Sequence, residues 1–129
     1  MEKQEIDQFL AGIKMAVMAT INKDGSPHLS PNWYYYDKLS FVTTKERLIF
    51  FCLRRDERMS ACIYEPPLAS DYMVIAGRAT VDDGDIWHDE RKVIRRYVEA
   101  GQVDGYVERW KPQPRILVKV TPDKVYTRF

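Results

Sequence analysis

The fold is decided by the stretch Asp24-Gly25-Ser26-Pro27-His28-Leu29-Ser30-Pro31-Asn32-Trp33-Tyr34-Tyr35-Tyr36-Asp37. The apolar segment 15–22 before it is typical of a β-strand. Residues 23–26 are typical of a hairpin turn, because glycine, asparagine and aspartate tolerate positive φ. A second strand is therefore expected to start near Pro27. Side chains alternate between the two faces of a strand, so this strand carries aromatic rings on both of its faces.

The two faces of this strand need different cover. Trp33 and Tyr35 point to one side, and Asn32, Tyr34 and Tyr36 point to the other. One face can fill the interior of a barrel. The other then needs a second apolar neighbour, such as a partner subunit or a flat aromatic ligand. The alternative is a strand buried between a sheet and a covering helix.

Length and charge define the broad class of the chain. At 129 residues it fits one domain, 1–129, with one core. Twenty basic and 19 acidic residues give a net charge of +1, which gives no support to a nucleic-acid or acidic-membrane partner. No apolar run approaches the roughly 20 residues that span a bilayer, and the N-terminus is too charged for a signal peptide. We therefore expect a soluble cytoplasmic protein.

Several chemistries have no motif in this sequence. Cys52 and Cys62 lack a C-x-x-C spacing and have only His28 and His88 as metal co-ligands, so we expect buried reduced thiols and no metal site. Phosphate loops of the Gly-x-Gly-x-x-Gly and Gly-Lys-Ser/Thr types are absent. So is the Gly-x-Ser-x-Gly elbow of hydrolases.

Short helices are expected at three places. Amphipathic spacing predicts helices over 5–13 and 45–56, and a third that begins at an Asp85 cap and ends at Gly101. Residues 102–113 are polar and contain glycine and proline, which indicates a loop. In that loop, two aromatic residues are candidate lid or interface anchors, namely Tyr106 and Trp110.

The strands are expected to be antiparallel where hairpin turns join them. Gly77 indicates a bulge or a close backbone approach, and Pro122-Asp123 indicates a turn between the last two strands. Six or seven strands in so short a chain favour a small barrel, because closure leaves no unpaired edge. The expected strands are 15–22, 27–37, 39–44, 59–64, 71–81, 114–121 and 124–128.

Four cations lie just beyond the strand expected over 39–44. Lys45 and Arg47, together with the N–H groups at the start of the following helix, would suit a phosphate. For Arg54 and Arg55, ordinary surface ion pairs are an equal alternative.

At this point the sequence resembles a known family. Four blocks occur in the family's order and cover roughly residues 6–126. They resemble the pyridoxamine 5'-phosphate oxidase-like split β-barrel superfamily, and within it the small flavin and deazaflavin oxidoreductases that bind coenzyme F-420. The blocks are Ala19-Thr-Ile-Asn-x-Asp-Gly-Ser-Pro-His-Leu-Ser-Pro-Asn-Trp33, Phe41-Val-Thr-Thr44, Leu53-Arg-Arg-Asp-x-Arg-Met-Ser60 and Val74-Ile-Ala-Gly-Arg-Ala79.

The resemblance implies an antiparallel split β-barrel of the FMN-binding type, and a homodimer with two cofactor sites between the subunits. Arg47 would hold the phosphate of the cofactor tail, with Lys45 as a second cation. His28 is a candidate proton donor. The other subunit would cover the substrate side, with Tyr72 and Trp87 as candidates. The implied cofactor-binding residues are His28, Ser30, Pro31, Asn32, Val42, Thr43, Thr44, Lys45 and Arg47.

The sequence departs from the family where a phosphate is usually bound. Related sequences carry cations or polar groups at the positions of Ile49, Phe51 and Cys52. The loss of such groups removes charge-assisted hydrogen bonds worth roughly 1.5–3 kcal/mol each. The first expected function is hydride transfer between coenzyme F-420 and a small planar unsaturated substrate. An FMN-dependent reductase or oxidase, and a non-catalytic flavin- or haem-binding module, are the alternatives.

Overall fold

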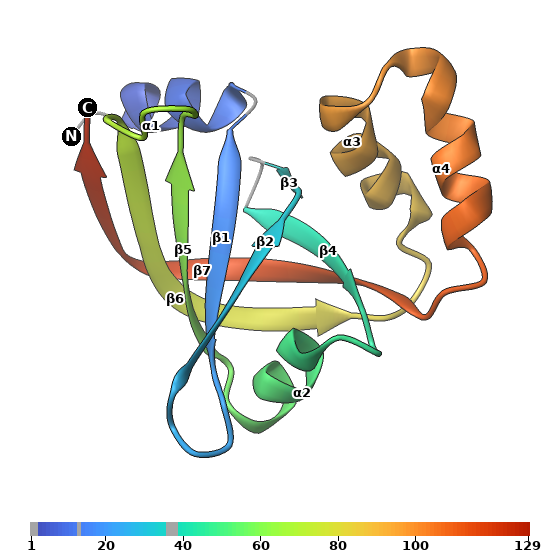
Figure 1. The fold of residues 1–129 in the computed structure, drawn as a ribbon, viewed down its shortest axis with the longest axis horizontal. Helices are drawn as coiled ribbons and strands as arrows, with labels where there is room; N and C mark the ends of the chain where they lie inside the picture. The colour runs from blue at the N-terminus through green and yellow to red at the C-terminus, as the bar shows by residue number, and fades with distance from the viewer. Residues whose placement is uncertain (1–2, 13, 36–38) are drawn as a thin grey trace.

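A curled antiparallel sheet forms the body of the protein, with short helices at its ends and along one side (Figure 1). The computed structural model describes residues 3–12, 14–35 and 39–129. Within them the sheet has seven strands, which confirms a mainly β split barrel with short helices. The elements are α1 (Lys3–Ala11), β1 (Met15–Ile21), β2 (Pro27–Asn32), β3 (Tyr34–Tyr35), β4 (Ser40–Thr44), α2 (Leu48–Arg55), β5 (Arg58–Tyr64), β6 (Tyr72–Asp82), α3 (Trp87–Tyr97), the 3-10 turn η1 (Ala100–Gln102), α4 (Val103–Trp110) and β7 (Arg115–Arg128).

The strand order places two sequence neighbours at opposite edges of the sheet. The order is β2-β1-β5-β6-β7-β4-β3, and Trp33 alone separates β2 from β3 in the sequence. The predicted strand over 27–37 is therefore broken at Trp33, and the sheet has to curl until its edges meet there. No ladder joins β2 to β4. Instead the side-chain amide of Asn32 donates a hydrogen bond to the backbone carbonyl of Val42, at 3.1 Å. We call this junction between β2 and β4 the seam.

Large apolar side chains fill the interior of the curled sheet. Met18, Phe41, Ile63 and Met73 are completely buried. Burial of such a side chain stabilises the fold by about 1.5–3 kcal/mol. Figure 1 shows α1 lying across one end of the sheet, where its Leu10 joins the same core.

Both faces of β3, and of Trp33 before it, are covered within the chain. Tyr34 is completely buried in the core. Trp33 and Tyr35 pack on the other side, in a cluster that includes Tyr97 of α3. This packing confirms the alternative of a covering helix on that side. Trp33 and Tyr35 stay partly exposed there, so further cover by a ligand or a partner subunit stays a prediction. Tyr36 lies outside the described residues.

The boundaries of α3 differ from the prediction. Its N-cap is Ile86 and not Asp85, and it ends at Tyr97 well before Gly101. The predicted apolar stripe on this helix is nevertheless correct, because Val93 and its neighbours on that face are buried. In the described parts of the chain, no helix has both the length and the apolar character needed to cross a membrane.

α4 is a helix where the sequence indicated a loop. Val103 and Val107 are one turn apart and are buried against Ile94 of α3. Gly105, in the middle of this short helix, costs about 1 kcal/mol relative to alanine. Packing against α3 outweighs that cost, and the sequence of the segment alone does not reveal this contact.

β7 is one long strand and not two. The predicted turn at Pro122-Asp123 is wrong, because residues on both sides of it pair with β6. The pairing shifts register between Ala76 and Gly77, opposite Pro122, which confirms the predicted bulge. A Cβ atom on Gly77 would overlap the backbone carbonyl of Thr121, so the two strands approach too closely for any side chain there.

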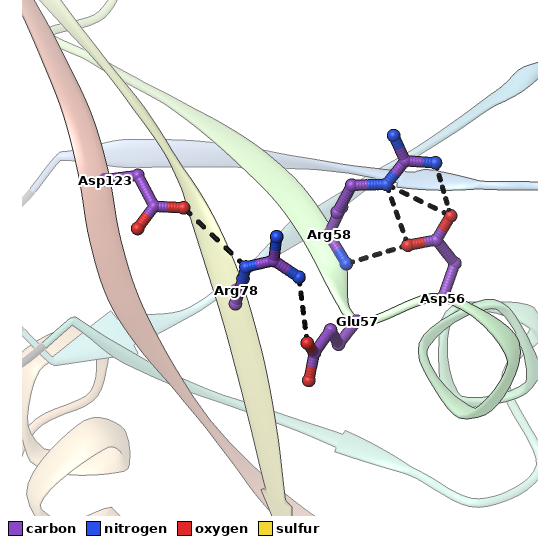
Figure 2. Close-up of polar contacts among 5 residues, drawn as sticks. All are labelled: Asp56, Glu57, Arg58, Arg78 and Asp123. Carbon is purple, nitrogen blue, oxygen red and sulfur yellow. Dashed lines mark hydrogen bonds and ion pairs between the residues drawn. The ribbon is translucent and has the colours of Figure 1, made fainter.

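Figure 2 shows an exposed ion cluster where α2 turns into β5. The carboxylate of Asp56 accepts hydrogen bonds from the backbone N–H of Arg58 at 3.1 Å and from its Nη2 at 2.6 Å. Those bonds lower the pKa of Asp56 to about 2. Arg78 on β6 pairs with Glu57 at 2.9 Å and with Asp123 at 4.0 Å. Asp56 and Arg58, which belong to the block 53–60 that resembles the family, therefore shape a turn on the surface. Ion pairs between exposed side chains add little stability.

We expect Gly77→Ala to lower the free energy of unfolding by about 1–3 kcal/mol, because the new methyl group has no space beside Thr121. Gly105→Ala is the matched control. Apart from the two chain neighbours and the backbone of the helix itself, nothing lies within 4 Å of the added methyl group there, and a helical alanine should raise stability by up to about 1 kcal/mol. Denaturant unfolding measures both changes. An unchanged stability of Gly77→Ala would contradict the close approach of β6 and β7.

Candidate functional site

A cavity of about 660 Å³ opens at the seam. This volume is within the usual range for small-molecule sites. Its walls come from β1, β2 and β4, the start of α2, the ends of α3 and α4, and the first residue of β7. The lining residues are Lys14, Met15, His28, Ser30, Pro31, Asn32, Trp33, Val42, Thr43, Arg47, Leu48, Ile49, Tyr97, Trp110 and Arg115.

Most of the predicted site residues come together in this cavity. The hydroxyl of Ser30 donates a hydrogen bond to the side-chain oxygen of Asn32, at 2.9 Å. That bond fixes the amide so that its nitrogen donates across the seam to Val42. The polar groups of the seam are thus held in place before any ligand arrives. The predicted residues that line the cavity are His28, Ser30, Pro31, Asn32, Val42, Thr43 and Arg47.

Four predicted residues lie outside the cavity lining. Thr44 is buried, and its hydroxyl oxygen accepts a hydrogen bond from the backbone N–H of Glu46. Lys45 forms an ion pair with Asp83, at 2.9 Å. The other two were expected to act from a partner subunit, which stays a prediction. Of these, Tyr72 lies beside Tyr126, and Trp87 packs in the cluster between α3 and α4.

The sequence did not indicate the aromatic wall of the cavity. Trp33 and Tyr97 stack with ring centroids 4.9 Å apart and planes within 8°, and Trp110 packs against Trp33 at 5.8 Å. The hydroxyl of Tyr97 donates to the backbone carbonyl of Lys14 and accepts from the N–H of Tyr34, at 3.2 and 3.3 Å. Amphipathic spacing predicted the helix that carries Tyr97 but gave this residue no role in the site, and Trp110 was noted only as a lid or interface anchor.

A buried ion pair stands behind this wall. The Nε of Arg115 donates to the carboxylate of Glu90 at 2.6 Å, and the ring of Trp110 covers the guanidinium at 4.0 Å. Glu90 is completely buried, and burial raises its pKa although Arg115 opposes the shift. No local signal in the sequence marks Arg115 as a site residue, because Glu90 is 25 positions away.

The described lining carries positive charge and no carboxylate. Lys14, Arg47 and Arg115 line the cavity together with His28, and no aspartate or glutamate does. Lys14 is paired with Glu65 at 3.1 Å. The exposed side chain of Arg47 has no hydrogen-bond or ion-pair partner among the described residues. Such a lining favours an anionic ligand.

The first turn of α2 reinforces this preference. Arg47, at the N-cap, leaves the helix without a side-chain cap, and Leu48 and Ile49 in the first turn line the cavity. The N–H of Phe50 donates to the carbonyl of Arg47 at 3.1 Å, whereas the N–H groups of Leu48 and Ile49 have no partner within the helix and can bind an anion. Of the three departures from the family pattern, Ile49 alone lines the cavity. Cys52 is buried, and Phe51 is 46% exposed elsewhere on α2.

The described residues form no recognisable metal site. They contain no group of three or more His, Cys, Asp or Glu side chains that could hold a metal ion. Cys52 is free and buried, and Cys62 is free and partly buried, with its pKa raised by burial.

Comparison with known proteins defines the class. The fold, with its cavity at an open seam, is that of a small split β-barrel. The chain belongs to the pyridoxamine 5'-phosphate oxidase family, whose model matches residues 2–129. No curated protein matches the sequence significantly.

Solved structures share the fold at low identity. A conserved hypothetical protein, Rv2991 from Mycobacterium tuberculosis, is 20% identical with a TM-score of 0.80, covering 99% of this chain and 84% of that protein. An F-420 reductase is 19% identical with a TM-score of 0.73, covering 93% and 94%. HutZ, the haem storage protein from Vibrio cholerae, is 16% identical with a TM-score of 0.72, covering 98% and 94%.

The buried carboxyl of Glu90 should make stability depend on pH. Because its pKa in the folded protein is raised above the ordinary 4.5, its contribution is complete below that value and is lost as pH rises through the folded pKa. We therefore expect the unfolding free energy of the native protein, minus that of Glu90→Gln, to fall in urea titrations as the pH rises above about 4.5. Glu108→Gln, which changes an exposed carboxyl, is the control. A difference that does not vary with pH would contradict this assignment.

Proposed function

We propose that the protein binds a phosphorylated flavin-type cofactor in the cavity and acts as an oxidoreductase. Coenzyme F-420 is the first candidate and FMN is the alternative. The observation that carries the proposal is the combination of an aromatic wall with a lining that has three cations and no carboxylate among the described residues. A planar ring system with an anionic tail matches both features.

The residues of the cavity fit such a molecule. Trp33 and Tyr97 offer flat apolar surface for a ring system. Asn32 and Thr43 offer polar groups at the seam, and Arg47 with the first turn of α2 would hold the phosphate. When bound, a cofactor of this kind supplies hydride transfer, here to a small planar unsaturated substrate.

His28 is the proposed proton donor. It is partly exposed and is the histidine of the described lining, so it has access both to the ligand and to solvent. An imidazole N–H can donate a proton, and histidine is the side chain that most often serves as a general acid.

A non-catalytic flavin- or haem-binding module is the second candidate. Ile49 adds apolar surface to the lining where the family resemblance predicts a cation, and Leu48 beside it adds more. An apolar site holds a flat ligand without assisting any reaction.

We also propose a homodimer, although not through the aromatic segment after β2. A row of half-buried or exposed apolar side chains crosses the outer face of five strands. Three of them, Val17, Cys62 and Val74, are neighbours in the register of β1, β5 and β6. The row ends in Pro31 on β2 and Tyr126 on β7.

A second copy fits this outer face because the face continues to the rim of the cavity. Pro31 belongs both to the apolar row and to the lining. Met15, two residues before Val17 on the same face of β1, also lines the cavity and is 41% exposed. A copy seated on the row would therefore stand beside the cavity and cover apolar surface. The proposed partner-subunit roles of Tyr72 and Trp87 depend on this dimer.

The cofactor proposal is tested by an absorbance-monitored binding panel with F-420, FMN, FAD and haem. We expect F-420 to bind most tightly, followed by FMN. Turnover of an unsaturated acceptor with reduced F-420 then separates the enzyme from the binding module. Binding of neither F-420 nor FMN below about millimolar would end the proposal, since that corresponds to only about 4 kcal/mol.

Arg47→Ala should weaken a phosphorylated cofactor more than its phosphate-free counterpart. The loss of a charge-assisted hydrogen bond of about 1.5–3 kcal/mol corresponds to about 10- to 150-fold in Kd. FMN and riboflavin, or F-420 and its deazaflavin chromophore, form the two matched pairs. Equal losses for both members of a pair would show that Arg47 is not the phosphate clamp.

The dimer proposal is tested by Val17→Lys and light scattering. Val17 lies on the outer face of β1, so a lysine there should leave the core intact and charge the proposed interface. We expect the native protein to have about twice the 15.2 kDa mass of the chain, and Val17→Lys to have that mass once. Thr80→Lys, an exposed β6 position outside the apolar row, is the control. A native monomer would rule out the dimer.

A further inference from the structure

Arg115 lines the cavity and has N–H donors that make no hydrogen bond to the described residues. Its side chain is only 10% exposed. Its Nε donates to Glu90, and Nη1 donates to the side-chain oxygen of Gln113 at 3.3 Å. A guanidinium carries five N–H donors, so three remain without a partner among the described residues.

The surroundings hold the guanidinium in one position. Glu90 is completely buried on α3, and its bond to Nε fixes one edge of the group. The ring of Trp110, at 4.0 Å, covers a face. A donor fork that is already fixed loses little conformational freedom when a ligand binds. Arg115 is therefore better prepared to bind than a free surface cation such as Arg47.

The backbones of Arg115 and Arg47 both lie beside Thr44, the last residue of β4. Arg115 pairs with Thr44 in the β4–β7 ladder, and the N–H of Arg47 donates to the carbonyl of Thr44 at 3.2 Å. Both arginines therefore flank the end of β4, where α2 begins. Lys45, the expected second cation, does not line the cavity and is paired with Asp83.

We infer that Arg115 is a second phosphate-binding residue, which holds the cofactor phosphate together with Arg47. This inference rests on the proposed function. A planar fork with free N–H groups binds two phosphate oxygens at once, which a lysine at that place would not do. The family pattern has a cation on α2 at the position of Ile49. In this chain Arg115 supplies that positive charge from β7. Glu90 is the positioning residue, since it acts through Arg115.

The test measures the preference for a phosphorylated cofactor, as the ratio of the Kd of riboflavin to that of FMN, or the same ratio for the deazaflavin chromophore and F-420. We expect Arg115→Gln to reduce this ratio about tenfold or more, and Arg115→Lys to reduce it less. Arg109→Gln is the matched control, because Arg109 also lies over an aromatic ring of α4, that of Tyr106, but outside the lining. It should leave the ratio unchanged.

A second variant separates loss of phosphate binding from loss of the fold. Arg115→Gln leaves Glu90 buried without its partner, so the double change Arg115→Gln with Glu90→Gln is measured beside it, and circular dichroism checks both. The double variant should show the same reduced ratio. If the native protein prefers the phosphorylated cofactor and folded Arg115 variants keep that preference, or lose both ligands equally, the inference is wrong while the proposed function stands. If the native protein binds no flavin or deazaflavin, both are wrong.

Discussion

The single-residue link at Trp33 is the constraint on which the structure depends. It joins the two edge strands β2 and β3, so the sheet must curl until its first and last strands meet. At that meeting the backbone ladder is missing, and one side-chain amide, that of Asn32, bridges the gap to Val42. A closed ladder would leave no room between the strands. The cavity lies at this seam because the sheet is closed there by side chains and not by backbone hydrogen bonds.

The helices α3 and α4 cover the aromatic side chains at the seam. Trp33 points away from the barrel core and would be exposed without them. Tyr97 stacks on it, and the hydroxyl of Tyr97 also holds backbone groups of Lys14 and Tyr34. One helix therefore fixes the aromatic wall and both chain segments that enter the seam.

The sequence predicted those features that depend on neighbours along the chain. The hairpin after residue 22, the helix α2 and the bulge at Gly77 follow from turn chemistry, amphipathic spacing and a missing side chain. The helix α4 and the unbroken strand through Pro122 depend on contacts with distant elements, so local signals misrepresent them. The same division holds for the site. Its β2 and β4 residues were found through sequence blocks, and Arg47 through its place just beyond the strand expected over 39–44. Arg115, in contrast, needs a partner 25 positions away.

Charge in such a site is defined by position in space and not by position in the sequence. The family resemblance places cations on α2, where this chain has Ile49 and Phe51, and that difference taken alone predicts a weak anion site. The lining nevertheless holds Arg47 and Arg115 and no described carboxylate. Since the end of β4 contacts both the start of α2 and the start of β7, a cation on either element reaches the same volume. The loss of a basic residue from one strand or helix is therefore weak evidence against binding until its spatial neighbours have been examined.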